Sequence, residues 1–150
     1  MQLLRKKLGF TLVEILIVVV ILGLLAALVI PAYVNAERES TRSALKQQLL
    51  QIRDQIELYR TRVSGLLPTT DPVSPMADGT WGVLVSSNYL KEEPLNMYIG
   101  TGTLNAGTQA QAIVALPGSA TGWFFESPNA TTLNIWAAGL DEANDRLSNE

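Results

Sequence analysis

The longest apolar run in the sequence places the strongest constraint on its fold. Residues 10–30 form a stretch of 21 residues in which Glu14 is the only charged side chain. About 20 apolar residues are enough for a helix to cross the hydrocarbon core of a bilayer. The run therefore excludes a purely water-soluble protein and predicts a membrane-spanning helix.

The residues before the run predict its orientation. Arg5, Lys6 and Lys7 precede it, and a basic flank stays on the cytoplasmic side of a membrane. A cleaved secretory signal would have a shorter apolar core ending in small residues, whereas Ala26 and Ala27 lie inside this one. We expect an uncleaved span, or a cleavage before it.

The helical pattern continues beyond Pro31, which ends the apolar stretch. An apolar stripe repeats every three or four residues and indicates an amphipathic helix over residues 32–63, ended by a C-cap at Ser64-Gly65. The stripe consists of Leu45, Leu49, Ile52, Ile56, Tyr59 and Val63. The two parts together predict one helix of about 53 residues, roughly 80 Å long.

The other face of this helix is charged, and two interpretations are open. It is either solvated or forms ion pairs with other subunits. Its residues are Glu37, Arg38, Glu39, Arg42, Lys46, Arg53, Asp54, Glu57, Arg60 and Arg62.

The remaining residues predict a small α+β region. Proline and glycine indicate loops, and alternating β-formers indicate strands that build an antiparallel sheet. We expect loops at 66–80 and 100–107, a short helix within 81–90, a weak strand at 112–116, a hairpin of strands 123–126 and 131–136 around a turn at 127–130, and an acidic tail at 137–150. Five aromatic residues are expected in the core between sheet and helix: Trp81, Trp123, Phe124, Phe125 and Trp136.

Composition argues against catalysis and against nucleic-acid binding. The chain contains no cysteine and no histidine, which removes the commonest nucleophile partners and general bases. From Ser64 onward two basic side chains face nine acidic ones, a poor match for a phosphate backbone. We predict that the protein is not an enzyme and that its C-terminal domain binds no nucleic acid.

The segment Gly9-Phe10-Thr11-Leu12-Val13-Glu14 follows the three basic residues and opens the apolar run. It resembles the prepilin cleavage and methylation signature of type IV pilins and type II secretion pseudopilins. The resemblance divides the chain into a leader (1–9), a transmembrane and filament-core helix (10–31), its amphipathic continuation (32–63) and a globular pilin-like domain (64–150).

The resemblance implies specific processing and partners. A prepilin peptidase would cut between Gly9 and Phe10 and then N-methylate Phe10. The mature chain would be stored in the bacterial inner membrane with a cytoplasmic N-terminus, and an assembly platform would add copies of it to a helical filament. Its C-terminal domain would be periplasmic, or extracellular in the filament, while Glu14 and Pro31 would serve assembly.

Glu14 also has a physical rationale of its own. A carboxylate within a bilayer is costly and implies a partner. The new α-amino group of Phe10, in the same chain or in a neighbouring subunit, is the partner we expect. The alternative is an interfacial carboxylate stabilised by the helix N-terminus.

Later segments resemble the major pseudopilin of type II secretion, which is the function we favour. They are Leu58-Tyr59-Arg60, Gly65 to Thr70, Asn88 to Lys91 and Glu93 to Asn96. A type IV pilin for adhesion, motility or DNA uptake is the alternative, and a bitopic membrane protein with a small binding domain is a remote one.

The C-terminal residues raise the question of a metal ion. Major pseudopilins hold calcium in a loop that begins like Gly139-Leu140-Asp141. Four side chains with suitable oxygens follow within five residues: Asp141, Glu142, Asn144 and Asp145. No glycine lies between them to bend the chain, and a short helical turn would splay them apart. We therefore expect no cofactor, with calcium at these residues as the open alternative.

Overall fold

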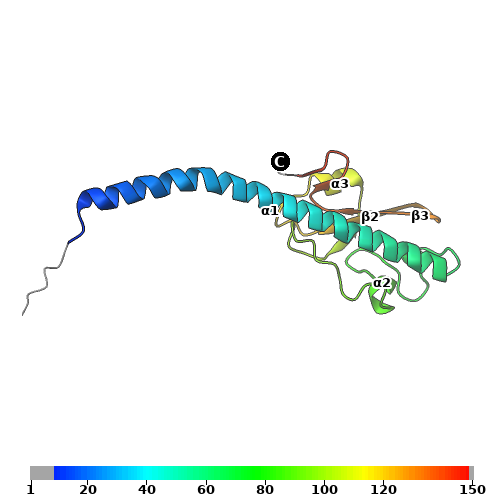
Figure 1. Cartoon of the computed structure of the whole chain (residues 1–150). Coiled ribbons are helices and arrows are strands. Elements are labelled where there is room, and N and C mark those ends of the chain that lie inside the picture. The colour runs from blue at the N-terminus through cyan, green and yellow to red at the C-terminus, as the bar shows by residue number, and fades with distance from the viewer. Residues whose placement is uncertain (1–8, 149–150) are drawn as a thin grey trace, which may run out of the picture. The chain divides into compact units, whose positions relative to one another are not determined.

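The computed structural model describes residues 9–148 and divides the chain into two compact units, Met1–Glu37 and Arg38–Glu150. Of the predicted leader, all but Gly9 lies outside the described residues. Within residues 9–148 the chain forms one long helix, three short helical segments and five short strands, so the predicted α+β class is confirmed (Figure 1).

Helix α1 runs from Leu12–Arg62, and Pro31 lies within these bounds. Its end agrees with the predicted C-cap. Ser64 and Gly65 both have positive φ angles, of 54° and 88°, and the Gly65 N–H donates to the Arg60 carbonyl at 2.8 Å. Glycine adopts this left-handed conformation without steric cost, which explains why the helix stops here.

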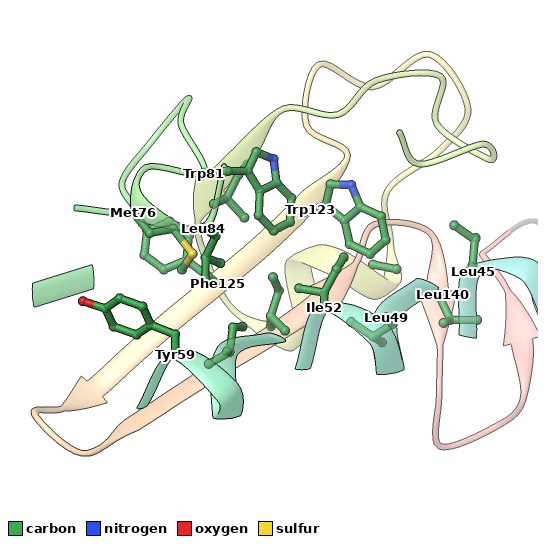
Figure 2. Packing of buried hydrophobic residues seen from close by; sticks show 14 of the residues in the cluster. Leu45, Leu49, Ile52, Tyr59, Met76, Trp81, Leu84, Trp123, Phe125 and Leu140 are labelled. Carbon is green, nitrogen blue, oxygen red and sulfur yellow. The ribbon is translucent and has the colours of Figure 1, made fainter. Parts of the chain in front are cut away.

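The apolar stripe of α1 is the helical wall of the hydrophobic core. Leu45, Leu49, Ile52, Ile56 and Tyr59 are each at most 3% exposed, as predicted, whereas Val63 is exposed because it lies beyond the helix end. These side chains form one buried cluster with Trp81, Trp123, Phe125 and Leu140, among others (Figure 2).

The three-stranded sheet supplies the opposite wall. Strand β2 (Trp123–Asn129) pairs antiparallel with β3 (Thr132–Ala137), which confirms the predicted hairpin. The turn is shorter than expected. Strand β2 continues through Ser127 and Pro128, and the register shifts between Glu126 and Asn129. Such an irregularity is where a strand tolerates a proline, which has no N–H to donate.

The prediction of a loop at 100–107 was wrong, and the predicted antiparallel sheet has one additional strand that pairs in parallel. Strand β1 (Leu104–Ala106) lies in that segment and pairs parallel to β2, with Leu104 opposite Trp123. The sheet is therefore mixed. Leu104 is fully buried. The parallel pairing joins segments about 20 residues apart, so the local sequence pattern does not predict this strand.

The short helices lie at the edges of the core. The 3₁₀ turn η1 spans Pro68–Thr70, and α2 spans Val83–Ser86, within the range predicted for a short helix. The expected strand at 112–116 was wrong, because Ala112 and Ile113 end helix α3 (Gln109–Ile113) and residues 114–116 form no strand. Thr108 caps α3: its hydroxyl accepts from the Gln111 N–H, and the Gln111 side chain accepts from the Thr108 N–H.

Residues 137–148, the described part of the predicted acidic tail, are folded. Strands β4 (Leu140–Asp141) and β5 (Arg146–Leu147) form a small antiparallel hairpin, and Leu140 and Leu147 are both buried. Gly139 precedes it with a φ of 82°, and a Cβ there would lie 2.3 Å from the Tyr98 ring. A glycine is therefore required where the chain enters this hairpin.

The aromatic residues are mostly core, as expected. Trp81, Trp123 and Phe125 are buried, and the two indole rings meet edge to face with centroids 6.0 Å apart. Each indole N–H donates to a backbone carbonyl: Trp81 donates to Gly102, and Trp123 donates to Pro94. Phe124 and Trp136 are only half-buried, because they lie on the other face of their strands.

Candidate assembly segment and C-terminal turn

The apolar part of α1 exposes its side chains. From Leu12 to Ile30 every large hydrophobic side chain is about half exposed or more, and Phe10 is 78% exposed. Among the described residues, one helix is long and apolar enough to cross a membrane, with an 18-residue window of mean hydropathy 3.2 that is not buried at all. Exposing so continuous an apolar surface to water is unfavourable in free energy, so lipid or protein must cover it.

Glu14 and Thr11 form a capping box at the start of this helix. The Glu14 carboxylate accepts from the Thr11 N–H at 2.8 Å and from the Thr11 hydroxyl at 2.9 Å, and the Thr11 hydroxyl accepts from the Glu14 N–H at 3.2 Å. This arrangement satisfies donors that the first helical turn otherwise leaves without partners.

The partner of Glu14 in this uncleaved chain is therefore Thr11. The predicted partner, an α-amino group on Phe10, exists only after cleavage, so that pairing stays a prediction. Sequence reasoning missed Thr11, although threonine three residues before glutamate at the head of an apolar run is the signal of a capping box.

The predicted cleavage site is sterically open. Gly9 and Phe10 are both exposed, and a Cβ built on Gly9 would have no neighbour within 4 Å. Helix α1 begins only at Leu12, so both residues precede the regular helix. A peptidase needs an accessible backbone around the bond it cuts, and both Gly9 and Phe10 are accessible.

At the other end of the chain, residues 141–146 form what we call the C-terminal turn. Asp141 is its buried anchor. Its carboxylate accepts from the Asn144 side-chain amide at 2.6 Å, from the backbone N–H groups of Ala143 and Asn144, and from the Arg146 guanidinium at 3.4 Å. The Asn144 amide is the main cause that lowers the pKa of Asp141.

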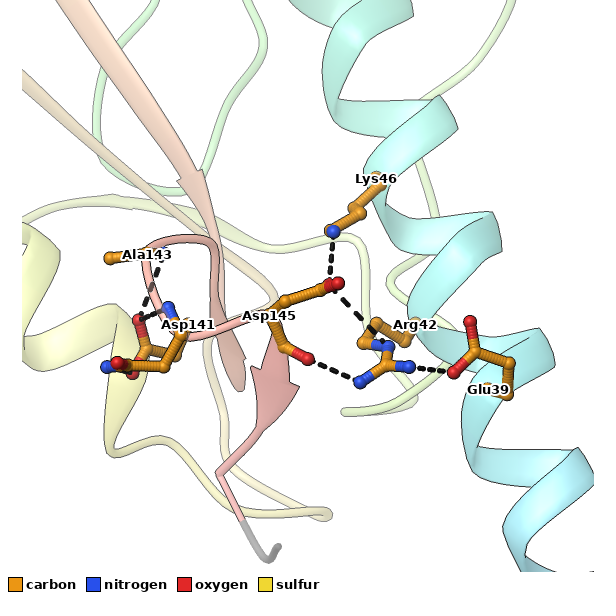
Figure 3. Close-up of polar contacts among 7 residues, drawn as sticks. Glu39, Arg42, Lys46, Asp141, Ala143 and Asp145 are labelled. Carbon is orange, nitrogen blue, oxygen red and sulfur yellow. Dashed lines mark hydrogen bonds and ion pairs between the residues drawn. The ribbon is translucent and has the colours of Figure 1, made fainter.

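Glu142 and Asp145 point to the helix instead. Glu142 forms a bidentate ion pair with Arg53, at 2.8 and 2.9 Å. The Asp145 carboxylate pairs with Lys46 and Arg42, and the Asp145 carbonyl accepts from Arg42 (Figure 3). The ammonium group of Lys46 lowers the pKa of Asp145.

The four residues that the sequence left open as alternative calcium ligands have separate partners in this structure. Their acidic groups are divided among separate donors, and the Asn144 amide presents its nitrogen to Asp141. Within the described residues, no three His, Cys, Asp or Glu side chains are grouped so that they could hold a metal ion. A calcium site needs six to eight converging oxygens, and these diverge.

The charged face of α1 has a role that neither sequence interpretation included. Arg42, Lys46 and Arg53 form ion pairs with the C-terminal turn of the same chain. Arg53 also donates to the Ile135 carbonyl of β3 at 2.9 Å. These three side chains, although partly exposed, thus have partners within the chain and connect the C-terminal turn to the helix.

Comparison with known proteins identifies the N-terminal segment first. Residues 4–30 match the family described as the prokaryotic N-terminal methylation motif. The match covers Gly9, Phe10 and Glu14, together with most of the apolar run.

The chain is also similar to several proteins named type II secretion system core protein G. It is 34% identical to that of Vibrio cholerae over 71 residues (47% of this chain, 48% of the relative) and 34% identical to that of Dickeya chrysanthemi over 67 residues (45% and 43%). The protein from Pseudomonas aeruginosa is 39% identical over 56 residues (37% and 39%).

The chain thus spans about half, or less, of the length of the curated relatives it matches. No solved structure matches it significantly. Together with the methylation motif, these similarities confirm the resemblance to the pseudopilins.

Proposed function

We propose that this protein is a structural subunit of a helical filament in a type II secretion-like system, equivalent to the major pseudopilin. The observation that carries the proposal is the exposed apolar part of α1 placed directly after a methylation motif. The relatives named core protein G support this assignment over a pilin for adhesion, motility or DNA uptake.

The physics of the exposed helix supplies the mechanism. A single apolar helix without protein cover is stable in a bilayer, because its backbone hydrogen bonds are all internal. Once copies associate, the same surface packs against neighbouring helices. Head-to-tail contacts that do not close on themselves generate a helical filament. The globular unit, with its own core, then forms the outside of that filament.

Membrane placement follows from the basic residues. Arg5, Lys6 and Lys7 hold the N-terminus in the cytoplasm, so the unit Arg38–Glu150 is exported to the periplasmic side. The partners are a prepilin peptidase acting at Gly9, an inner-membrane assembly platform and further copies of this chain.

Cleavage changes the chemistry around Glu14. The cut between Gly9 and Phe10 converts the Phe10 amide into an α-amine, which carries a positive charge. Glu14, now held by Thr11, lies within one helical turn of this new group. A buried filament core favours the pairing of the two charges, in the same chain or between neighbours.

The test is processing in a host that carries the secretion system. Mass spectrometry of the membrane-bound protein should show a chain that begins at methylated Phe10. Gly9→Val should block cleavage, because a branched side chain next to the scissile bond crowds the peptidase. Gly23→Val is the matched control, since Gly23 lies inside the helix and away from the cut.

The expected result is uncut Gly9→Val precursor without filaments, beside normally cut Gly23→Val. Filaments built from chains that retain Met1 would overturn the proposal. Normal processing of Gly9→Val would show that the cut lies elsewhere.

A further inference from the structure

We infer that the C-terminal turn is closed by cations of the chain's own helix, Arg42, Lys46 and Arg53, and needs no bound divalent ion. The turn carries the acidic residues that a calcium loop would use. In this structure each of them has basic or amide partners within the chain. The inference concerns the globular unit and holds whatever the filament does.

The spacing of the three basic residues supports this. They are four and seven residues apart, so they lie on one side of α1. Two of them stand next to a member of the buried stripe, since Lys46 follows Leu45 and Arg53 follows Ile52, and Arg42 lies one helical turn before Lys46. The basic row therefore runs along the border of the core, where the C-terminal hairpin packs.

The pairs are also complementary in geometry. Arg53 binds both oxygens of Glu142, and a planar guanidinium matches a carboxylate in this way. Arg53 bridges to the Ile135 carbonyl, so it connects the turn with β3. Lys46 and Arg42 share Asp145, and Arg42 is itself oriented by Glu39 (Figure 3).

Asp141 completes the closure without a metal. It is almost fully buried, yet its oxygens accept from the Asn144 amide, two backbone N–H groups and Arg146. A carboxylate supplied with these donors has no need of a metal ion to offset its burial. A calcium ion would have to break these bonds and draw Glu142 and Asp145 away from the helix.

The test uses the full-length chain in detergent micelles and follows thermal unfolding by tryptophan fluorescence. Trp81 and Trp123 are buried in the core that the hairpin covers. Lys46→Glu should lower the melting temperature by about 3–6 °C, since it places like charges opposite each other. Lys91→Glu is the matched control, because Lys91 is exposed on a loop outside the turn; it should change the melting temperature by less than about 1 °C.

A double-mutant cycle separates the ion pair from general damage. Lys46→Ala and Asp145→Ala should each lower the melting temperature, and the double variant should lose less than the sum of the two single losses. Calcium at about 5 mM, above the dissociation constants of weak extracellular sites, and then chelator should each leave the wild-type melting temperature unchanged.

Two results would overturn the inference. One is a calcium-dependent rise of about 5 °C or more in the wild type that disappears in Asp145→Ala. The other is a double variant, Lys46→Ala with Asp145→Ala, whose loss equals the sum of the two single losses, because additivity would show that the residues do not interact.

Discussion

At the scale of single residues, Glu14 combines two duties that substitutions can separate. Its carboxylate caps the helix through Thr11, and its charge is the proposed partner of the mature N-terminus. Glutamine retains the capping oxygen but not the charge, whereas alanine retains neither.

Glu14→Gln and Glu14→Ala should both be cleaved normally and both fail to form filaments, if the charge is what assembly requires. Immunoblots for processing and electron microscopy for filaments measure the two outcomes. Filaments from Glu14→Gln but not from Glu14→Ala would assign the role to capping alone.

Tyr59 is the second residue with a measurable signature. Burial, reinforced by a 2.8 Å hydrogen bond to Asp71, raises its pKa to about 12. In an unfolded chain tyrosine ionises near pH 10. The raised value therefore gives stability that is complete below pH 10 and is lost as the pH rises through about 12.

We expect the free energy of unfolding to fall by roughly 2–3 kcal/mol between pH 10 and pH 12, at about 1.4 kcal/mol per unit of pKa. Urea titrations at several pH values measure this. Tyr59→Phe cannot ionise and should flatten the decline. If the free energy of unfolding of Tyr59→Phe fell equally steeply between pH 10 and pH 12, Tyr59 would not be the cause of the decline.

At the scale of elements, α1 was predicted well because its signals are local. The apolar run, the three-four stripe and the Ser64-Gly65 cap each lie within a few turns of helix. The β2–β3 hairpin was also readable, since two β-rich segments flank a turn. Strand β1 and the β4–β5 hairpin were missed, because their pairing and burial depend on partners distant in the sequence.

Helix α3 was missed for a different reason. Its capping box, Thr108 to Gln111, is visible in the sequence, but the apolar residues after it outweighed the signal. Among the site residues, the sequence identified Gly9, Phe10 and Glu14 from a compact motif. The partners of Asp145 and Glu142 lie 99 and 89 residues away on α1, and no pattern in one sequence connects them.

The stripe of α1 supplies a matched pair of leucines. Leu49 is 1% exposed in the core, and its neighbour Leu50 is 57% exposed. Leu49→Ala should lower the free energy of unfolding by about 2–5 kcal/mol, while Leu50→Ala should change it by less than about 0.5 kcal/mol. Chemical denaturation of both full-length variants measures the difference, and similar losses would contradict the assigned helix face.

At the scale of the whole molecule, the ionised acidic side chains limit the pH range over which the fold is stable, because they become protonated at low pH. The Ser74 N–H and the Tyr59 hydroxyl lower the pKa of Asp71, and the pKa values of Asp141 and Asp145 are lowered by their own partners. A lowered pKa gives stability that is complete above the unfolded value near 4 and is lost as the pH falls through the folded value.

The globular unit should therefore keep its stability from neutral pH down to about 4 and lose it below. Asp141→Asn, which cannot titrate, should be less stable at pH 7 and show a shallower acid decline. Melting temperatures between pH 2 and pH 7 test this. If the melting temperature of Asp141→Asn fell as steeply at low pH as that of the wild type, Asp141 would not contribute to the acid sensitivity.

The exposed apolar helix has a consequence for how reversible the proposed filament assembly would be. Lipid tails are about as apolar as leucine, so moving this helix from bilayer to filament core exchanges one oily environment for another. The hydrophobic effect, which dominates folding in water, nearly cancels in that exchange. Small contributions then decide the direction: close packing, released lipid, and the meeting of Glu14 with a new amine. When the free-energy difference between bilayer and filament is this small, a small energy input is enough to add subunits to the proposed filament. Subunits can return to the membrane when that input stops.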